Sequence, residues 1–453
     1  MASKNIPGIR ASLIFSSITH LMGKVAREFD KDQPNVLQVK TELPKRIYCV
    51  LAPDLISSFF VHASVGITKP PGLLPREDWL MRESLVTDTG SHWKNKRTAM
   101  SSPFLPKNLD VFFEHIAPAT ERLLKRIDSY SAAKQPFDVH LEMRRCTVDF
   151  SLQMFFSEQL ADGDLDRVTE NVTCLESGMP EPIPLWLPLP ANLNFKKESI
   201  KLRDFCARLI AKRRNLHVKP GDYLDHLLAV EDIELHRSWN NEEIVDQMLA
   251  VFLGASAIAT PLTWTTCQLS HYPDVCRAML AEFNAVSPGS EMVSYQASRE
   301  MSYFECVIKE TMRLYPTFWG NIRYNEELLE IDGYSFPPKS TFLLLRYFAN
   351  RHPHYWQNPQ AFDPLRFSPE NPHRIRPNHY LPFASGPRTC LGIHLSIPII
   401  KMILGSLFSR FDLFNLTTAP NGQAKIVFNY GLYPQKPIML HVKNRVDQAQ
   451  ATN

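Results

Sequence analysis

The sequence predicts a mainly α-helical protein with a minor β part, folded as a single domain over residues 1–453. Three observations support this. Through most of residues 108–310 the apolar residues recur at helical intervals. Glycine is scarce, with 17 residues in 453, which disfavours an all-β chain rich in tight turns. Short strand-like runs flank the helical region, and no shift in composition marks a domain boundary.

The first elements are expected in residues 34–67, where Arg46–Leu51 is the clearest strand. Helical periodicity then predicts four helices, over Val111–Ser129, Leu141–Phe156, Lys196–Arg214 and Tyr223–Val230. Between the second and third lies Pro180–Pro190, with five prolines in eleven residues. Because proline breaks helices, this segment is expected to be an extended connector.

The longest helix is expected to begin near Asn240, a plausible N-cap with Glu243 three residues on, and to continue to about Leu269. Its apolar face predicts that it crosses the protein interior. Pro261 lacks an N–H, so we expect a kink there and an Ala257 carbonyl without its i+4 donor. Two alternatives stay open: this carbonyl bonds a water or a substrate polar group, or it turns to Thr260 or Ser256. Further on, Glu330–Phe348 predicts hairpin strands that turn at Asp332-Gly333.

Composition excludes several classes of protein. A formal net charge of +3 is too small to indicate nucleic-acid binding. No run of apolar residues reaches the length of a membrane span, so residues 1–33 are expected to be an N-terminal segment without one, and 443–453 a tail. A cytoplasmic protein is expected, unless an anchor was removed. The eight cysteines form no Cys-x-x-Cys pair, which disfavours zinc and favours reduced thiols.

One cysteine, Cys390, differs from the rest in its neighbours. Gly386 permits a tight turn before it, and Arg388 places a cation two residues from the sulfur. The cysteine precedes an apolar helix, whose free N–H groups stabilise an anion. Gly392 allows a flat ligand to approach closely. These features favour a thiolate held against a flat ligand, as in a haem with an axial cysteine.

The segment Phe383-x-x-Gly386-x-Arg388-x-Cys390-x-Gly392 matches the haem-binding signature of the cytochrome P450 family at every fixed position, and the chain is identified as resembling that family. Glu310-x-x-Arg313, the segment around Arg366 and Trp93-x-x-x-Arg97 are similar to three further family motifs. The resemblance implies a triangular helical prism enclosing haem b, with Cys390 on the iron. It also implies a structural Glu310–Arg313–Arg366 triad. The residues implied to hold the haem are Trp93, Arg97, Arg323, Phe383, Arg388 and Gly392.

The central helix departs from the family's pattern. Where the family has an acid and an alcohol that relay protons, this chain has Ser256 and Ala257. Alanine has no donor and serine is not acidic. Three interpretations stay open. The first is a monooxygenase that takes its protons from water or from a substrate hydroxyl. The second is peroxide-driven or reductant-free chemistry, such as rearrangement or dehydration. The third is a haem-binding or helical interaction protein without catalysis.

By position in the family, several apolar and aromatic residues are expected to line a substrate pocket. They are Leu185, Trp186, Phe252, Ile258, Phe318, Trp319, Phe428, Tyr430 and Tyr433. This set predicts a lipophilic or aromatic substrate. Lys94, Lys96 and Lys107 are expected near the Cys390 loop, where an acidic ferredoxin, flavodoxin or reductase could dock. If the chemistry needs no reductant, that partner is absent.

Overall fold

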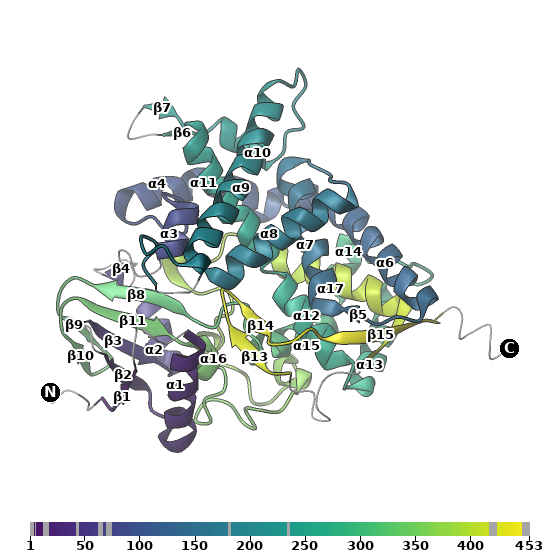
Figure 1. Ribbon diagram of the computed structural model, residues 1–453. Helices are drawn as coiled ribbons and strands as arrows, with labels where there is room; N and C mark the ends of the chain where they lie inside the picture. The colour runs from purple at the N-terminus through teal and green to yellow at the C-terminus, as the bar shows by residue number, and fades with distance from the viewer. Residues whose placement is uncertain are drawn as a thin grey trace.

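The computed structural model describes residues 4, 6–11, 18–41, 45–61, 67–68, 75–179, 183–232, 236–415 and 424–445. Parts of the predicted end segments, residues 1–3, 5, 12–17 and 446–453, lie outside the described residues, as do 180–182 of the proline-rich connector. The described chain has a triangular outline, with the sheet at one corner and helices over the rest (Figure 1).

Helices dominate the structure, as predicted. The α-helices are α1 Ile18–Asp32, α2 Pro53–Val61, α3 Pro75–Met81, α4 Gly90–Ser101, α5 Asp110–Phe113, α6 Ile116–Ala133, α7 Val139–Phe156, α8 Asp162–Gly178, α9 Pro190–Arg214, α10 Tyr223–Leu228, α11 Asn241–Ser256, α12 Ala259–Leu269, α13 Pro273–Val286, α14 Tyr295–Glu300, α15 Ser302–Leu314, α16 Arg346–Ala349 and α17 Ile393–Arg410. Helix α9 begins six residues before the predicted start because Pro190 occupies the first turn, where proline is tolerated.

The predicted central helix is present but divided into α11 and α12. Its capping box is confirmed: Asn240 Oδ1 accepts from the Glu243 N–H at 3.0 Å, and a Glu243 carboxylate oxygen accepts from the Asn240 N–H at 2.7 Å. The predicted break is confirmed at residues 257–258. Of the two alternatives for the Ala257 carbonyl, the structure has the turn to Thr260, whose N–H donates to this carbonyl at 3.1 Å. Without an N–H at Pro261, the turn tightens to an i,i+3 bond.

The β part lies mostly in one six-stranded sheet of order β1-β2-β3-β11-β8-β4. Its strands are β1 Gly8–Arg10, β2 Val36–Lys40, β3 Arg46–Val50, β4 Ile67–Thr68, β8 Asn321–Asn325 and β11 Ser340–Leu344. Strand β11 pairs in parallel with β3 and antiparallel with β8, with Arg323 opposite Phe342. The sheet thus joins strands from the first 68 residues to strands at 321–344.

Smaller β elements complete the fold. They are β5 Phe137–Asp138, β6 Glu231–Asp232, β7 Arg237–Ser238, β9 Leu329–Ile331, β10 Tyr334–Phe336, β12 Phe411–Asn415, β13 Ile426–Phe428, β14 Leu432–Pro434 and β15 Met439–Asn444. The predicted hairpin turn is confirmed between β9 and β10. Asp332 and Gly333 both have positive φ, 49° and 80°, as a primed hairpin turn requires.

Two helices among the described residues are long and apolar enough to cross a membrane, Asn241–Leu269 and Ile393–Arg410. This corrects the expectation that no segment reaches that length. In both helices most of the apolar window is buried inside the protein, 89% and 61%. They are therefore core helices of the fold, and the position of α17 against α12, α15 and α6 agrees with this.

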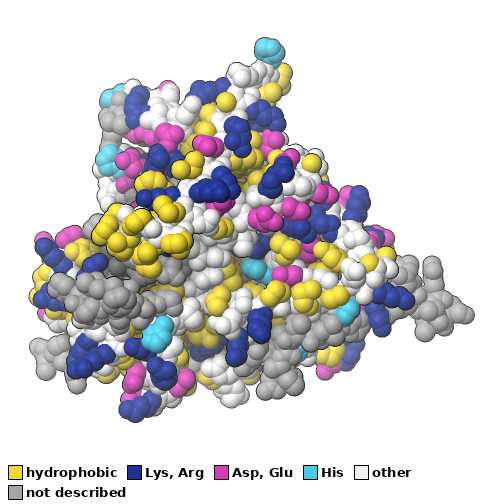
Figure 2. Space-filling view, viewed as in Figure 1, with side chains coloured by type: hydrophobic (Ala, Val, Ile, Leu, Met, Phe, Trp, Pro, Cys, Tyr) yellow, Lys and Arg dark blue, Asp and Glu magenta, His cyan; other side chains and the backbone are white. Residues whose placement is uncertain are grey.

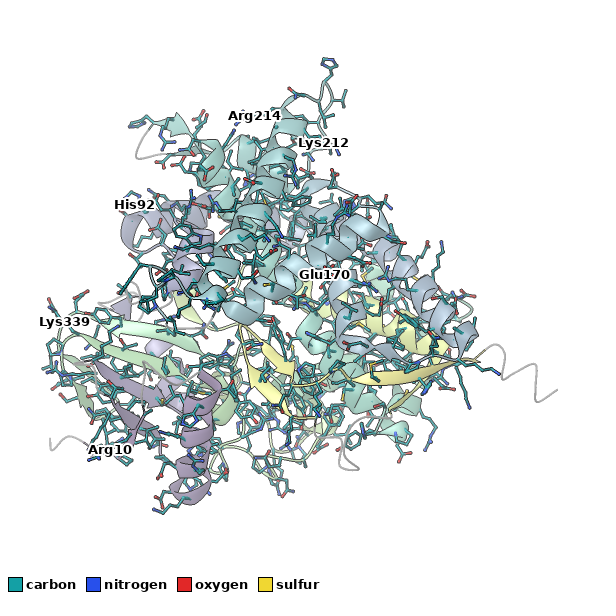
Figure 3. All side chains as sticks on the ribbon, in the orientation of Figure 1. Arg10, His92, Glu170, Lys212, Arg214 and Lys339 are labelled. Atoms are coloured by element: carbon teal, nitrogen blue, oxygen red, sulfur yellow. The ribbon has the colours of Figure 1, made fainter. Side chains whose placement is uncertain are left out.

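Basic and acidic side chains are interspersed over the face shown in Figure 2, in agreement with the small net charge. Charged side chains labelled in Figure 3, such as Arg10, Lys212 and Lys339, extend away from the ribbon into solvent. No one sign of charge dominates this face, so its electrostatics do not favour a polyanionic partner.

We expect acid to destabilise the fold through His352. This side chain is 0% exposed and packs against Phe29 and Tyr355. Burial, with the nearby His354, lowers its pKa to about 4, against about 6.5 in an unfolded chain. The unfolded state therefore binds the proton first, and stability falls as the pH drops from 6.5 towards 4. Between pH 7 and pH 5 the loss is about 2 kcal/mol.

Urea denaturation at pH 7 and pH 5 measures this effect. The His352→Gln variant should lose less stability between the two pH values than the unchanged protein does, by about 2 kcal/mol. The control His217→Gln alters an exposed histidine and should leave the pH dependence as it was. Equal pH dependence in all three proteins would contradict the assignment to His352.

Candidate functional site

A cavity of about 470 Å³ brings together most of the residues singled out in the sequence. It lies between the loop before α17 and the break between α11 and α12. The predicted residues that line it are Trp93, Arg97, Ala257, Ile258, Phe318, Trp319, Arg323, Phe383, Arg388, Cys390, Gly392 and Tyr430. Residues more than 330 positions apart in the chain thus share one cavity.

The Cys390 loop has the tight geometry that its glycines predict. The Cys390 N–H donates to the Phe383 carbonyl at 3.0 Å. Gly386 has φ +72°, and a Cβ there would lie 2.4 Å from the Phe60 carbonyl oxygen, so no other residue fits. A Cβ at Gly392 would lie 3.9 Å from Cys390 Sγ. The loop therefore packs on α2 and directs the thiol into the cavity.

The groups around the Cys390 sulfur act on its pKa in opposite directions. Desolvation raises the pKa of Cys390, while the Gly392 N–H and the charges of Arg97 and Arg346 lower it. The thiolate therefore stays a prediction. Arg388, the cation expected beside the sulfur, instead stacks on Trp93 with 4.3 Å to the ring centre and donates to the Asp88 carbonyl at 2.8 Å.

Four guanidinium groups line the same cavity, from Arg97, Arg323, Arg346 and Arg388. Burial lowers the pKa of each, and that of Arg323, Arg346 and Arg388 to about 10. Within the described chain, Nε of Arg323 and Nε of Arg346 have no hydrogen-bond partner. Such a concentration of buried cations calls for an anionic ligand. The two carboxylates of a haem fit these donors.

The structural triad is assembled as the resemblance implies. Glu310 binds Arg313 through two bonds of 2.8 Å and lies 3.4 Å from Arg366 Nε. Arg313 also donates to the carbonyls of Asn350, Pro359 and Ala361, at 2.7–2.9 Å. The triad therefore fixes residues 350–366. It does not contact the Cys390 loop itself, whose carbonyls at Leu381 and Pro382 are held by Arg346.

On the opposite side of the cavity, Ala257 lines the wall while Ser256 does not. The Ser256 side chain is buried, and its hydroxyl lies 2.6 Å from a carboxylate oxygen of Glu176. Of the two residues assigned to catalysis from the sequence, neither therefore presents a proton donor to the cavity. Ser256 is buried where the end of α11 meets Glu176 of α8.

Five of the predicted pocket residues are not among the described residues that line the cavity: Leu185, Trp186, Phe252, Phe428 and Tyr433. Leu185 is buried in the core, and the Tyr433 hydroxyl donates to Glu176. Trp186 is 77% exposed, because the connector leaves it on the surface. Phe252 is fully buried and packs against Phe156, and Phe428 packs against Trp319. Both are core residues. These wrong predictions have one cause. The position of a residue along the chain indicates which segment it belongs to, but not the direction in which its side chain extends.

The cavity also contains residues that sequence reasoning missed. Arg346 follows β11 and reaches the Cys390 loop from the sheet, and Glu77 of α3 and Asn321 of β8 add polar atoms to the wall. No local motif distinguishes these positions. Only Arg346 could have been identified from the sequence. It is a cation within the apolar run Leu343–Phe348, and a buried charge needs a partner.

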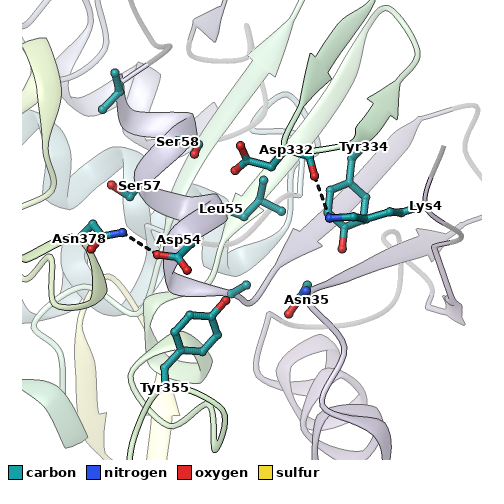
Figure 4. Close-up of a pocket in the computed structure, with 12 residues that line it drawn as sticks. Lys4, Asn35, Asp54, Leu55, Ser57, Ser58, Asp332, Tyr334, Tyr355 and Asn378 are labelled. Carbon is teal, nitrogen blue, oxygen red and sulfur yellow. Dashed lines mark hydrogen bonds between the residues drawn. The ribbon is translucent and has the colours of Figure 1, made fainter. Parts of the chain in front are cut away.

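A second pocket, of about 480 Å³, lies elsewhere, against α2 and the β9–β10 hairpin (Figure 4). Polar residues that line this pocket are hydrogen-bonded to one another. Asn378 donates to Asp54 at 2.5 Å, and Lys4 donates to the Asp332 carbonyl at 2.8 Å. It contains none of the residues predicted for the site.

The three lysines predicted to receive an electron donor differ in exposure. Lys96 is buried, forms a 2.6 Å ion pair with Asp88 and donates to the Glu83 carbonyl, so the expectation that it takes part in docking is wrong. Lys94 and Lys107 are exposed. Lys96 instead supports the segment that carries Asp88, whose carbonyl binds Arg388.

Comparisons with known proteins agree with this geometry. The Cytochrome P450 family model matches residues 10–442. The chain is 27% identical to Cytochrome P450 3A6 of Oryctolagus cuniculus, over 93% of this chain and 85% of that protein. It is 26% identical to Cyclooctatin synthase of Streptomyces melanosporofaciens, over 82% and 81%. The solved structure of retinoic acid bound cyanobacterial CYP120A1 is 18% identical, with a TM-score of 0.85 over 98% of this chain and 100% of that one.

Proposed function

The chain belongs to the cytochrome P450 family, and from this premise we propose a monooxygenase that oxidises a lipophilic or aromatic small molecule. It would use dioxygen and electrons from a separate redox protein. The observation that carries the proposal is the single cavity, which is lined by Cys390, by four arginines and by many apolar residues. The cavity accounts for both a charged cofactor and an apolar substrate.

Each residue on the charged side has a role in holding a haem b. Cys390 would bind the iron, and Arg97, Arg323 and Arg388 would hold the carboxylates together with the indole of Trp93. Arg346 supports the Cys390 loop through its bonds to Leu381 and Pro382. Phe383 and Gly392 leave room for a flat ring. A haem with a thiolate ligand supplies the oxidising power for inserting one oxygen atom into a C–H bond.

The apolar side of the cavity supports the substrate class. Ala257 and Ile258 come from the break between α11 and α12, and Phe318, Trp319 and Tyr430 from the loops that face it. Phe318 and Tyr430 meet edge to face, with ring centres 5.1 Å apart. Such a wall binds flat or lipophilic molecules, orients them by contact and excludes water. Lipids, terpenoids and aromatic natural products all fit this description.

A second candidate is peroxide-driven or reductant-free chemistry by the same cavity. It is favoured by one observation: Ala257 faces the cavity without a donor, and the Ser256 hydroxyl is directed to Glu176. A monooxygenase on this chain must take its protons from water or from the substrate. A reaction that starts from peroxide or from an oxygenated substrate needs fewer delivered protons.

Turnover assays distinguish the two candidates. Haem-loaded protein is incubated with lipophilic substrates, once with a ferredoxin or flavoprotein reductase system and once with hydrogen peroxide alone. We expect a product that depends on the reductase and contains one oxygen atom from dioxygen. Product formed only with peroxide would support the second candidate instead, and turnover in neither assay would contradict both.

We further propose that the electron donor is an acidic ferredoxin, flavodoxin or reductase that meets the exposed Lys94 and Lys107. The cytoplasmic location and the absence of nucleic-acid partners stay predictions from composition. The haem type is likewise part of the proposal, because Arg97, Arg323 and Arg388 fit the carboxylates of any haem that carries two.

A further inference from the structure

Four polar side chains from four elements meet beside the cavity: Arg144 of α7, Glu176 of α8, Ser256 of α11 and Tyr433 of β14. We name this group the Glu176 cluster. Each member is at least nine-tenths buried, and Glu176 is 0% exposed. A carboxylate in such surroundings is tolerated only when its oxygens are fully bonded.

Glu176 is the common acceptor of the cluster. One carboxylate oxygen accepts from Ser256 at 2.6 Å, and the other accepts from Arg144 at 2.7 Å and from the Tyr433 hydroxyl. Its backbone carbonyl accepts from the Tyr430 N–H at 3.2 Å. Burial, and then the Glu176 charge, raise the pKa of Tyr433 well above its usual value, so this hydroxyl keeps its proton and donates.

Each bond made by Glu176 reaches a segment that lines the cavity. Ser256 directly precedes Ala257 in the helix break, and Tyr430 lies in the turn of the β13–β14 hairpin. Glu176 itself lies three residues before Met179, which also lines the wall. One residue therefore connects three of the segments that line the cavity.

The cluster also explains why the central helix carries a serine. An acidic side chain at position 256 would face the Glu176 carboxylate across a distance now spanned by a 2.6 Å hydrogen bond. Two buried carboxylates at that separation repel each other. The hydroxyl of Ser256 can donate, and it bonds the charged acceptor in preference to the neutral Leu253 carbonyl 2.9 Å away.

We propose that Glu176 is a positioning residue that sets the size of the substrate side of the cavity. It holds the α11–α12 break, the β13–β14 hairpin and the end of α8 at fixed separation. The inference rests on the proposed function, since it takes this cavity to be the substrate site. Removing the bond from Ser256 or the bond from Tyr433 to Glu176 is expected to let the cavity wall move outward and admit a larger molecule.

Two single variants test the inference and leave the buried ion pair between Arg144 and Glu176 intact. Ser256→Ala removes the donor from the helix break, and Tyr433→Phe removes the donor from the hairpin. The control is Thr173→Val. It removes a 2.8 Å bond from Arg144, a member of the Glu176 cluster, to Thr173, which lies outside the cluster. That bond joins α7 to α8 and touches neither the α11–α12 break nor the β13–β14 hairpin.

The readout compares two ligands of haem-loaded protein by optical titration, imidazole and the bulkier 4-phenylimidazole. In both test variants the dissociation constant of 4-phenylimidazole should fall relative to that of imidazole by about fivefold, the effect of losing one ordinary hydrogen bond. Thr173→Val should leave the ratio within about twofold. An unchanged ratio in both test variants, or an equal change in the control, would overturn the inference.

A second readout separates this inference from the proposed function, because it needs no haem. Amide hydrogen exchange of the unloaded protein should quicken about fivefold at residues 257–260 in Ser256→Ala, and at 426–434 in Tyr433→Phe. Thr173→Val should change neither segment. Failure to take up haem with these exchange effects present would count against the proposed function alone. Normal exchange in both segments would refute the positioning role of Glu176.

Discussion

Replacing Cys390 by alanine is expected to abolish the thiolate-type spectrum of the haem-loaded protein and all turnover. Among the cysteines in the described part of the chain, only Cys390 lines the cavity. Alanine has no atom that can bind iron, so haem retained by the arginines would lose its sulfur ligand. The measurement is the absorption spectrum of the reduced protein under carbon monoxide, where a thiolate ligand gives a red-shifted Soret band.

The matched control for this experiment is Cys174→Ala. Cys174 is partly exposed on α8, accepts a 3.2 Å bond from Asn194 and does not line the cavity. Its variant should keep the red-shifted band and the activity. Retention of the band in Cys390→Ala would show that another residue binds the iron. If the protein without any substitution takes up no haem, the assignment of the whole site is contradicted.

Much of the architecture around Cys390 follows from local sequence. The capping box at Asn240, the break near Pro261 and the Asp332–Gly333 turn were all predictable, because each depends on residues within a few positions of one another. The turn of the Cys390 loop belongs to the same class through the positive φ of Gly386, whereas its close approach to the Phe60 carbonyl joins distant parts of the chain. Such short-range rules determine where elements begin, end and turn.

What the sequence did not predict are the contacts between distant elements. Glu176 is separated by 80 residues from Ser256 and by 257 from Tyr433. In isolation, it resembles any acidic residue on an amphipathic helix. Arg346 likewise gains its role only when β11 carries it to the Cys390 loop. Trp186, predicted for the pocket, is exposed because the side-chain direction in an irregular connector has no period that could be used.

Replacing Glu310 by glutamine is expected to have the largest effect on stability. Glu310 and Arg313 are both 0% exposed and form a bond at each carboxylate oxygen. Glutamine keeps the size of the side chain but removes the charge that balances Arg313 and Arg366. A buried guanidinium without its anion costs on the order of 3–5 kcal/mol. Urea denaturation of the haem-free protein should therefore show a loss of that size.

The control is Asp164→Asn, which breaks an ion pair with the same i,i+3 spacing between two side chains that are 52% and 76% exposed. Water already screens that pair, so its loss should cost less than about 1 kcal/mol. Because Glu310 fixes residues 350–366 and does not touch the cavity, folded Glu310→Gln protein loaded with haem should keep the red-shifted band. Unchanged stability would contradict the structural role of the triad. A folded variant without the band would show that Glu310 also supports the haem site, against a role confined to residues 350–366.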